Sequence, residues 1–532
     1  MVMHALHHPS PWPYPCQLLV YSISWVQIGK NLILISIFIL NQTILKAISN
    51  LQITSPIKPQ FIPTVSTGPD LEGTHSSTSI KLERKMAATQ AANLVEKAVG
   101  HSGTATVTTD ISNYNNEHGV ETGETIRATV WQGKNSVGIV EMPKPRVVDA
   151  GDVIVRVTGS TVCGSDLHLY HGVIPQIQKG DVLGHECCGV VESVGPESTK
   201  YKPGQRVVVS FPIACGACKR CKAQLYSQCE NTNENTITNA MYGKRTAGIF
   251  GYSHFTGGFA GGQAEYLRVP YGDVNLLPIP NDVPDEKALF LSDVVGTSWH
   301  CVVDTGVNKG DIVAVWGAGP IGQMAAEFAF YHGAERVILI DGGDGAWRLE
   351  YVKSKVPRVE VVDFSKLPKG ESVSSHLRKI TDHNLDVCLE CVGGEYAKGW
   401  IHFFEQMVGA ETDTSEIVNE MITAVRPFGR VGLTGVYAGY TNHFNIGSLM
   451  QTGVRLIGNG QAPVQKYWGD LMNLIQKGEI DPLRMVSHRF RLEDIDKVYA
   501  MFNQRDGGLQ KVYLETRHSA PAAKEGPQLT KL

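Results

Sequence analysis

Four cysteines lie close together in one part of the sequence. They are Cys215, Cys218, Cys221 and Cys229, among Gly, Lys and Asn residues typical of a loop. Thiolates at this spacing can surround a zinc ion completely and leave no position for water, as in structural zinc sites. Such an ion folds a loop that has no hydrophobic core of its own. We therefore predict a structural zinc here, with free thiols or disulfides as the alternative.

A glycine-rich turn follows the apolar segment 312–316. It reads Gly317-Ala-Gly319-Pro-Ile321-Gly322 and is followed by the predicted helix Gln323–Tyr331. In this G-x-G-x-x-G pattern the glycines allow a tight turn, close approach of a pyrophosphate and close packing of helix and strand. The start of the helix presents free N–H groups to the same anion. The pattern therefore predicts a dinucleotide site, with an ordinary tight turn as the alternative.

An acidic residue ends the next predicted strand, Val337–Ile340. Asp341 comes 19 residues after Gly322, where a carboxylate hydrogen-bonds the ribose hydroxyls of the adenosine half. A carboxylate there also repels a 2′-phosphate, so the sequence favours NAD over NADP. Arg348 could stack on or hydrogen-bond the adenosine; the alternative for this residue is a solvated charge on a helix.

Three shorter segments contain side chains that bind metals or move protons. Two of them, Cys163-Gly-Ser-Asp166-Leu-His168 and Gly184-His185-Glu186, precede the cysteine loop, and the third contains Asp293, before the glycine turn. Each is ordinary by itself, because a single histidine is often structural and Asp293 could cap a helix. Their order relative to the cysteine loop and the glycine turn is more specific.

Together these segments resemble the zinc-containing medium-chain dehydrogenases over roughly residues 126–516. The sequence is most similar to the glutathione-independent formaldehyde dehydrogenase branch, because Asp293 stands where familiar alcohol dehydrogenases carry a cysteine. The stretches Glu411-Thr-Asp413 and Gly435-Val-Tyr437-Ala-Gly439 match the same branch. The resemblance implies NAD-linked oxidation of a small alcohol or aldehyde hydrate, with formaldehyde-like substrates. A polyol or longer-chain alcohol dehydrogenase and a non-catalytic binding protein of the same fold are the alternatives.

The resemblance also implies a catalytic metal site. Cys163, His185 and Asp293 would hold a zinc whose fourth position stays open for water or substrate. Glu186 would be a neighbouring group or a transient ligand. Asp166 would orient His185 through a hydrogen bond.

A proton path and a cofactor site follow from the same resemblance. Ser165 would accept the proton of the substrate and pass it, through the ribose of the nicotinamide half, to His168 near the solvent. The residues implied to contact NAD are Gly164, Ser165, His168, Thr297, Gly317, Gly319, Ile321, Gly322, Asp341 and Arg348.

The segments that must position these groups change character along the chain. Short apolar strands alternate with Gly and Pro turns over residues 126–296, which predicts a β-rich domain that the resemblance identifies as GroES-like. Strands alternate with helices over 297–455, which predicts a doubly wound parallel sheet, a Rossmann NAD-binding domain. Residues 456–516 are expected to return to the catalytic domain, and the polar tail 517–532 is expected to be disordered. The fold class is therefore α/β.

Residues 1–125 differ from the rest of the chain. The apolar stretch from Leu18 to Leu40 has the length of a membrane span, but Lys30 lies near its middle and opposes insertion. The first arginine is Arg84, and no Lys or Arg precedes the apolar stretch, which disfavours mitochondrial and secretory signals. We interpret 1–125 as an extension of low order or a mis-called start, with Met86 as the natural first residue. A membrane anchor and another targeting role are the alternatives.

The composition limits the partners and the compartment. The chain has 532 residues and a net charge of only −4, so it has no basic field to attract nucleic acid or anionic lipid. Its 11 cysteines are spread over a long chain, which favours a reducing, cytoplasmic setting over a disulfide scaffold. We expect a small-molecule partner, and the resemblance implies a homo-oligomer, either a dimer or a tetramer.

Overall fold

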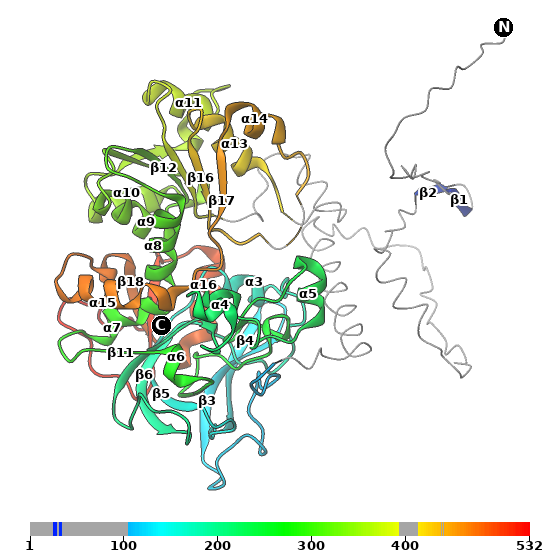
Figure 1. Cartoon of the computed structure of the whole chain (residues 1–532), viewed down its shortest axis with the longest axis vertical. Coiled ribbons are helices and arrows are strands. Elements are labelled where there is room, and N and C mark those ends of the chain that lie inside the picture. The colour runs from blue at the N-terminus through cyan, green and yellow to red at the C-terminus, as the bar shows by residue number, and fades with distance from the viewer. Residues whose placement is uncertain (1–24, 29–30, 35–104, 393–412, 438, 440) are drawn as a thin grey trace. The chain divides into compact units, whose positions relative to one another are not determined.

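The computed structural model describes residues 25–28, 31–34, 105–392, 413–437, 439 and 441–532 (Figure 1). The chain divides into two units, Met1–Gly73 and Thr74–Leu532. In the first unit, β1 (Trp25–Ile28) and β2 (Asn31–Leu34) form an antiparallel pair. Most of the apolar stretch from Leu18 to Leu40, and Met86, lie outside the described residues. No helix within the described ranges is long and apolar enough to cross a membrane.

A seven-stranded sheet forms the β-rich part of the second unit. Two C-terminal strands belong to it, because β19 pairs antiparallel with β5 and parallel with β18. Along the sheet the order is β11 (Leu276–Pro278), β7 (Arg206–Val209), β6 (Cys187–Val194), β5 (Val153–Ser160), β19 (Lys511–Glu515) and β18 (Val486–Arg491), and β10 (Tyr266–Val269) also pairs with β5. Two smaller antiparallel pairs are β3 (Thr125–Gly133) with β4 (Ser136–Pro143) and β8 (Pro212–Ile213) with β9 (Gly248–Ile249).

A six-stranded parallel sheet forms the α/β part. Its order is β14 (Glu360–Asp363), β13 (Arg336–Asp341), β12 (Ile312–Trp316), β15 (Val387–Glu390), β16 (Arg430–Leu433) and β17 (Arg455–Gly458). Its central strands are apolar and buried on both faces, which is typical of parallel sheets covered by helices. The predicted α/β fold class is confirmed, because the second unit combines a β-rich part with a six-stranded parallel sheet.

The helices of the second unit are mostly short in the β-rich part and longer around the parallel sheet. In the β-rich part they are α3 (Asp166–Tyr170), α4 (Lys219–Lys222), α5 (Thr236–Tyr242), α6 (Gly272–Asn275), α7 (Asp285–Ala288) and α16 (Ile495–Gln504). The remaining described helices are α8 (Val294–Thr305), α9 (Pro320–Tyr331), α10 (Trp347–Lys355), α11 (Val373–Ile380), α13 (Glu416–Ala424), α14 (Ile446–Thr452) and α15 (Trp468–Gln476).

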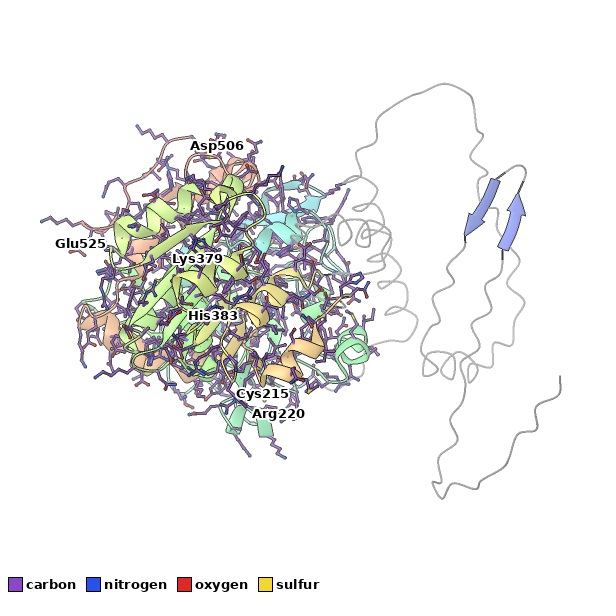
Figure 2. All side chains as sticks on the ribbon, turned by 90° about the horizontal axis from the view of Figure 1, so that it is seen from above. Cys215, Arg220, Lys379, His383, Asp506 and Glu525 are labelled. Carbon is purple, nitrogen blue, oxygen red and sulfur yellow. The ribbon has the colours of Figure 1, made fainter. Side chains whose placement is uncertain are left out.

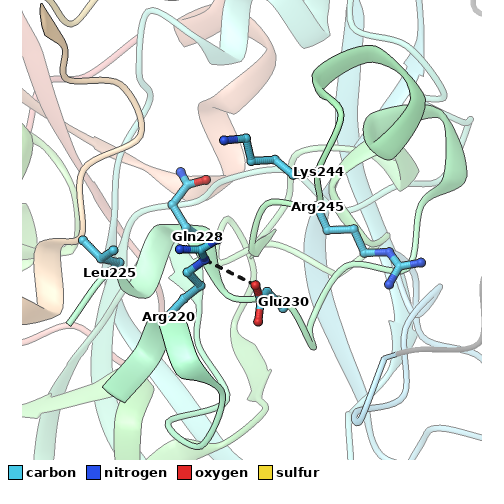
Figure 3. Close-up of a pocket in the computed structure, with 6 residues that line it drawn as sticks. All are labelled: Arg220, Leu225, Gln228, Glu230, Lys244 and Arg245. Atoms are coloured by element: carbon cyan, nitrogen blue, oxygen red, sulfur yellow. Dashed lines mark ion pairs between the residues drawn. The ribbon is translucent and has the colours of Figure 1, made fainter. Parts of the chain in front are cut away.

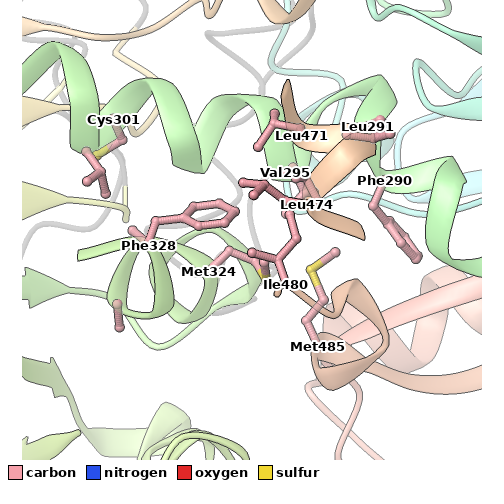
Figure 4. Close-up of a cluster of buried hydrophobic side chains, with 14 of the residues drawn as sticks. Phe290, Leu291, Val295, Cys301, Met324, Phe328, Leu471, Leu474, Ile480 and Met485 are labelled. Atoms are coloured by element: carbon pink, nitrogen blue, oxygen red, sulfur yellow. The ribbon is translucent and has the colours of Figure 1, made fainter. Parts of the chain in front are cut away.

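One buried apolar cluster fixes the helices that start near the functional residues. Val295 of α8, Phe328 of α9 and Leu474 of α15 belong to it (Figure 4). α8 begins directly after Asp293, and α9 begins directly after Gly319 of the glycine turn. Burial of these large side chains therefore sets the position of Asp293 relative to the turn.

Residues 105–124 belong to the folded part, although we expected them to lie outside it. Ile111 and Tyr114 are each only 3% exposed and pack in the apolar cluster of β3. The backbone N–H of Thr106 donates to the carbonyl of Asn231 at 2.9 Å, and that of Ala260 donates to Ile111 at 2.8 Å. We name residues 105–124 the N-terminal arm. Sequence periodicity does not reveal it, because a few buried side chains and scattered tertiary hydrogen bonds hold it in place.

The tail 517–532 also differs from the expected disorder. Buried Arg489 donates to the carbonyl of Ala520 at 2.7 Å and accepts, through its own carbonyl, the N–H of Thr530 at 2.8 Å. The N–H of Ala523 donates to Glu286 at 3.0 Å. The composition of the tail is polar, but these partners on the catalytic domain satisfy its backbone groups.

One histidine joins the N-terminal arm to the catalytic domain. His254 Nδ1 lies 3.0 Å from Asp110 in the arm, and Nε2 lies 3.2 Å from Asp181 and 3.0 Å from Ser112. Burial opposes the charged ring, but the hydrogen bonds to the two carboxylates outweigh this and raise the pKa of His254 to about 9. The ring is therefore charged at neutral pH and pairs with both acids.

We predict that alkaline pH weakens the contacts of His254 with Asp110 and Asp181 and so lowers the free energy of unfolding. Folding raises the pKa of His254 from its ordinary value of about 6.5 to about 9. The charged ring therefore contributes fully to the free energy of unfolding below pH of about 6.5, and this contribution is lost as the pH rises through about 9. The contribution is at most about 3 kcal/mol. Unfolding free energies of wild type and His254→Gln should differ at pH 6 and converge above pH 9, whereas His383→Gln, at an exposed histidine, should match wild type throughout. A difference independent of pH would contradict the charged pairing.

Candidate active site

Four side chains that can bind a metal meet in one cluster. The ligand atoms of Cys163, His185, Glu186 and Asp293 all lie within 4.8 Å of one another. His185 Nε2 is 3.4 Å from Asp293 Oδ2 and 3.8 Å from Glu186 Oε1. The fold thus brings together the three ligands implied by the sequence and adds Glu186 as a fourth candidate. A thiolate, an imidazole and carboxylates at these distances form a donor set that suits zinc.

Asp166 holds two of these candidate ligands in place. Its Oδ1 lies 3.2 Å from His185 Nδ1, and its Oδ2 accepts the backbone N–H of Cys163 at 2.9 Å. The carboxylate is 1% exposed, and the amide of Gln263 also donates to it at 3.4 Å. Tyr499 in turn donates to Gln263 at 3.1 Å. The sequence did not indicate Gln263 or Tyr499, because neither belongs to a local motif.

The charges around His185 favour a cation. Burial disfavours the charged imidazole, but Asp166, Asp293 and Cys163 raise the pKa of His185 well above its ordinary value. The same anionic groups would stabilise a metal ion at this position. An unpartnered buried oxygen, Glu186 Oε2, is a further sign that the cluster suits a cation.

Asp293 stays ionised although it is enclosed. Burial opposes its charge, but hydrogen bonds from His185 and Thr297 and the nearby ammonium of Lys511 lower its pKa. The hydroxyl of Thr297 donates to Asp293 Oδ1 at 2.5 Å. Asp293 is the residue before α8, yet its side chain makes no capping bond in the described structure. The carboxylate is thus directed to the cluster and not to the helix backbone.

Lys511 is a member of the site that the sequence did not reveal. Its Nζ lies 2.5 Å from Glu186 Oε1, and both side chains are 1% exposed. Lys511 stands at the start of β19, more than 300 residues after its partner in the sequence. Only the pairing of β19 with the β-rich sheet brings the two residues together.

Ser165 and His168 follow Cys163 at the start of α3, with Ser165 before the helix and His168 within it. Ser165 directly precedes the helix, and the N–H of His168 donates to its carbonyl at 3.1 Å. Tyr252 is buried, and burial raises the pKa of its hydroxyl. The ring of Tyr252 meets that of His185 edge-on, with 5.8 Å between centroids. Tyr252 is therefore another site residue that no motif indicated.

The four cysteines of the loop also meet. The sulfurs of Cys215, Cys218, Cys221 and Cys229 lie within 4.8 Å of one another. Backbone N–H groups donate to three of these sulfurs at 3.3–3.5 Å, and the amide of Asn231 donates to Cys215 at 3.6 Å. Such donors stabilise thiolates. Four sulfurs in one group fit a closed metal site without an open position.

The surface beside the cysteine loop is basic. Cys215 and Arg220 lie together at one edge of the folded unit (Figure 2). A small pocket of about 150 Å³ lies there, lined by Arg220, Leu225, Gln228, Glu230, Lys244 and Arg245 (Figure 3). Arg220 and Glu230 form an ion pair at 3.3 Å across it. The pocket is separate from the Cys163 cluster in its residues.

The glycine turn has the geometry that its pattern predicts. Gly317 has φ of 97°, where a side chain would be strained, and a Cβ on Gly322 would collide with the carbonyl of Gly317. Asp341 ends β13 and accepts the N–H of Ala318 at 2.9 Å. Asp341 therefore stabilises the glycine turn through this hydrogen bond, in addition to any contact with a ribose. The carbonyl of Ile321 accepts the hydroxyl of Ser298 in α8 at 3.1 Å.

The remaining residues implied by the resemblance have the following surroundings. Gly164 has open space where a Cβ would stand, and Arg348 lies 5.7 Å from the ring of Trp347. Asp413 is buried and accepts the N–H of Gly439 at 2.8 Å. Glu411 lies outside the described residues.

Comparison with known proteins identifies the family. The alcohol dehydrogenase GroES-like domain matches residues 149–281. A zinc-type alcohol dehydrogenase-like protein of Schizosaccharomyces pombe is 37% identical over 394 residues, which are 74% of this chain and 92% of that protein. The glutathione-independent formaldehyde dehydrogenase of Pseudomonas aeruginosa is 32% identical over 420 residues, 74% of this chain and 98% of the relative. The solved structure of alcohol dehydrogenase TADH from Thermus sp. ATN1 superposes with a TM-score of 0.61 at 32% identity, covering 74% of this chain and all of that one.

This agreement defines an oxidoreductase of the alcohol dehydrogenase type. The chain belongs to the zinc-type medium-chain alcohol dehydrogenase family, as the resemblance in the sequence implied. The two clusters of candidate ligands are consistent with two zinc ions in such an enzyme.

We predict that each cluster can lose its metal independently. Cys221→Ser should leave one zinc per chain, because three sulfurs hold the ion of the cysteine loop poorly. Cys163→Ala should also leave one zinc, but that of the loop. Cys388→Ala, at a buried cysteine of β15, should keep both ions. Metal analysis of purified protein measures this, and a Cys221→Ser protein with the full metal content would contradict the assignment.

Proposed function

We propose that this protein uses NAD to oxidise a small alcohol or the hydrate of a small aldehyde, with formaldehyde-like substrates. A catalytic zinc would be held by Cys163, His185 and Asp293, and a structural zinc by the cysteine loop. The observation that carries the proposal is the group of ligand atoms within 4.8 Å of one another. The similarity to the formaldehyde dehydrogenase of P. aeruginosa supports the choice of substrate. The resemblance in the sequence also implies a carboxylate at the position of Asp293 in that branch.

The atoms that would bind the metal determine what chemistry the Cys163 cluster can support. A zinc ion with one open position binds a hydroxyl group and lowers its pKa towards neutrality. Asp166 fixes the ring of His185 and the backbone of Cys163, while Thr297 fixes the carboxylate of Asp293. These contacts keep the ligands oriented, which such partners do in metal sites.

Ser165 is the proposed acceptor of the proton of the substrate. It lies two residues after Cys163, directly before α3. From Ser165 the proton would reach His168, one helical turn further along α3, through the ribose hydroxyls of the cofactor. Glu186 would act as a neighbouring group or transient ligand.

Aromatic rings favour a small substrate. Tyr252 and Phe211 both meet the ring of His185 edge-on, with centroid distances of 5.8 and 6.5 Å. Bulky rings next to the metal ligands reduce the volume left for substrate carbon atoms. A polyol or longer-chain alcohol is therefore the second candidate and not the first.

The glycine turn is the proposed NAD site. Its backbone and the start of α9 would face the pyrophosphate, and Asp341 would hydrogen-bond the adenosine ribose. Gly164, Ser165, His168, Thr297 and Arg348 are the further proposed contacts. The acid at the end of β13 makes NAD the favoured cofactor over NADP.

The setting of the enzyme is also a proposal. None of the ten cysteines among the described residues forms a disulfide, which suits a reducing compartment, and we place the protein in the cytoplasm. The family relationship suggests a homo-oligomer.

A substrate panel tests the proposed activity. We expect NADH to form with formaldehyde at the same rate with and without glutathione, and more slowly with sorbitol or octanol. NADH absorbance measures this. Dependence on glutathione, or a preference for sorbitol, would exclude the formaldehyde-like assignment. Absence of turnover with all substrates would favour the non-catalytic alternative.

Replacing the proposed proton acceptor should slow chemistry without loss of metal. Ser165→Ala should lower kcat by about 10²- to 10⁴-fold, because general-base assistance contributes this much. Zinc content should stay at the wild-type value. Ser354→Ala is the matched control, since that exposed hydroxyl bonds only the carbonyl of Tyr351 in its own helix. Unchanged kcat in the Ser165 variant would remove Ser165 from the proton path.

Asp341→Asn tests the cofactor preference. The amide oxygen can still accept the N–H of Ala318, but the negative charge is gone, so a 2′-phosphate is no longer repelled. The ratio of kcat/KM for NAD over that for NADP should fall about tenfold or more. Asp344→Asn, at an acid that is 91% exposed, should leave the ratio unchanged. Equal ratios in the two variants would argue against a ribose contact of Asp341.

A further inference from the structure

One buried glutamine contacts both of the segments that carry Cys163 and His185. The side chain of Gln263 is fully buried, and its amide nitrogen donates to the carbonyl of Thr161 at 3.0 Å and to Asp166 Oδ2 at 3.4 Å. Thr161 stands two residues before Cys163 in the sequence. Because Asp166 Oδ2 also accepts the backbone N–H of Cys163, the amide holds this segment at two points.

The same glutamine packs against the segment of His185. Its backbone N–H donates to the carbonyl of Leu183 at 3.0 Å. Gly184 has φ of 95°, and a Cβ at this glycine would collide with Cγ of Gln263. The glutamine side chain thus fills the space beside the residue that precedes His185. One side chain therefore connects two segments that must each supply a ligand to a single ion.

The partners of the Gln263 amide determine its direction. A backbone carbonyl and a carboxylate accept hydrogen bonds and cannot donate them, so the amide nitrogen must face Thr161 and Asp166. The amide oxygen then needs a donor, and the hydroxyl of Tyr499, which is also fully buried, donates to it at 3.1 Å. Without this hydroxyl the oxygen would lose its donor, and a reversed amide would place the oxygen against the carboxylate.

Packing between two helices holds the hydroxyl of Tyr499 in place. Tyr499 lies on α16, more than 200 residues after Gln263 in the sequence. Its ring lies beside that of Tyr170, the last residue of α3, with 5.5 Å between centroids. Both tyrosines belong to one buried apolar cluster, together with Leu169 of α3. The direction of the amide therefore depends on how α16 packs against α3.

The amide acts on His185 through Asp166. Because Asp166 Oδ2 accepts hydrogen bonds from Cys163 and Gln263, Oδ1 is left to face His185 Nδ1, 3.2 Å away. The other ring nitrogen, Nε2, faces the cluster and lies 3.4 Å from Asp293 Oδ2. A carboxylate beside Nδ1 favours the ring tautomer in which Nε2 keeps a lone pair for a metal.

We propose that Gln263 and Tyr499 are positioning residues of the catalytic metal site. Tyr499 fixes the direction of the Gln263 amide, and the amide holds Asp166 and the two ligand segments in the arrangement that binds the ion. Both residues act through Asp166 and not on the substrate. The inference rests on the proposed catalytic zinc, and it adds a hydrogen-bonded chain that determines how firmly the ion is held.

Release of metal to a chelator tests the inference without turnover. Tyr499→Phe removes one hydroxyl and keeps the ring, so the amide of Gln263 is free to reverse. 1,10-Phenanthroline should then remove the ion of the Cys163 cluster about tenfold faster than from wild type, because groups that orient metal ligands change metal affinity by about 10- to 100-fold. The ion of the cysteine loop should leave at the wild-type rate and serves as the internal control.

Tyr513→Phe is the matched control variant. Tyr513 is also buried, and its hydroxyl donates to the carbonyl of Thr158 at 2.8 Å, so this variant loses a comparable hydrogen bond. The melting temperatures of the two variants should fall by similar amounts. Only Tyr499→Phe should release the ion of the Cys163 cluster faster, which separates a positioning role from a general effect on stability.

Gln263→Met keeps an unbranched side chain of similar length but removes the amide. It should also speed release from the Cys163 cluster about tenfold. The double variant with Tyr499→Phe should release the ion at the rate of Gln263→Met alone, because the hydroxyl then has no amide to orient. In cobalt-loaded protein, the absorption bands of the Cys163 site should shift in both single variants, and those of the cysteine loop should not.

Three outcomes would overturn the inference. One is a Tyr499→Phe protein that releases its metal at the wild-type rate. Another is equal acceleration at both metal sites, since the substitution would then loosen the fold in general. The third is a double variant in which the two effects multiply, because Gln263 and Tyr499 would then act independently. Tyr499→Phe and its control remain sufficient if Gln263→Met does not fold.

The proposed function can fail separately. A wild type that binds two ions but forms no NADH would contradict the proposed activity and leave the role of Gln263 and Tyr499 in place. A wild type that binds no metal at the Cys163 cluster would contradict both. Metal content and turnover therefore distinguish the two failures.

Discussion

The structure depends on one requirement: a sulfur, an imidazole nitrogen and a carboxylate from distant segments must come within the reach of a single ion. Cys163 follows β5, His185 precedes β6 and Asp293 precedes α8. Antiparallel pairing of β5 with β6 brings the first two close. The third depends on the buried cluster around Val295 and Phe328, which fixes α8. The β-rich sheet and the buried cluster around α8 thus position the ligand atoms next to one another.

Bringing those atoms together concentrates negative charge in a place without water. Asp166, Glu186 and Asp293 are carboxylates, and Asp166 and Glu186 are almost completely buried. Such a group is tolerated when cations and hydrogen-bond donors compensate it. His185 and Lys511 provide positive charge, to which a metal ion bound in the cluster would add, while Thr297, Gln263 and the N–H of Cys163 provide donors. The electrostatic balance of the site is therefore spread over segments from residue 163 to residue 511.

The sequence predicted the features that neighbouring residues determine, and it did not predict those that depend on tertiary contacts. The cysteine loop and the glycine turn are recognisable because a few neighbouring residues determine their geometry, and the alternation of strands and helices predicted the parallel sheet. The metal ligands required resemblance to a family, since single cysteines and acids carry no signal. Lys511, Tyr252 and Gln263 reach the site only through tertiary pairing. The ordered structure of the N-terminal arm and of the tail was not predicted for a related reason. Their polar composition is typical of disordered segments, and the hydrogen-bond partners that order them lie elsewhere in the sequence.

Asn231 connects two parts of the molecule that the family relationship treats separately. Its carbonyl accepts the N–H of Thr106 in the N-terminal arm, and its amide donates to the sulfur of Cys215. The arm lies outside the region 149–281 that matches the family domain. The position of the amide that donates to the Cys215 sulfur is consequently linked, through one residue, to the docking of a segment more than a hundred residues upstream.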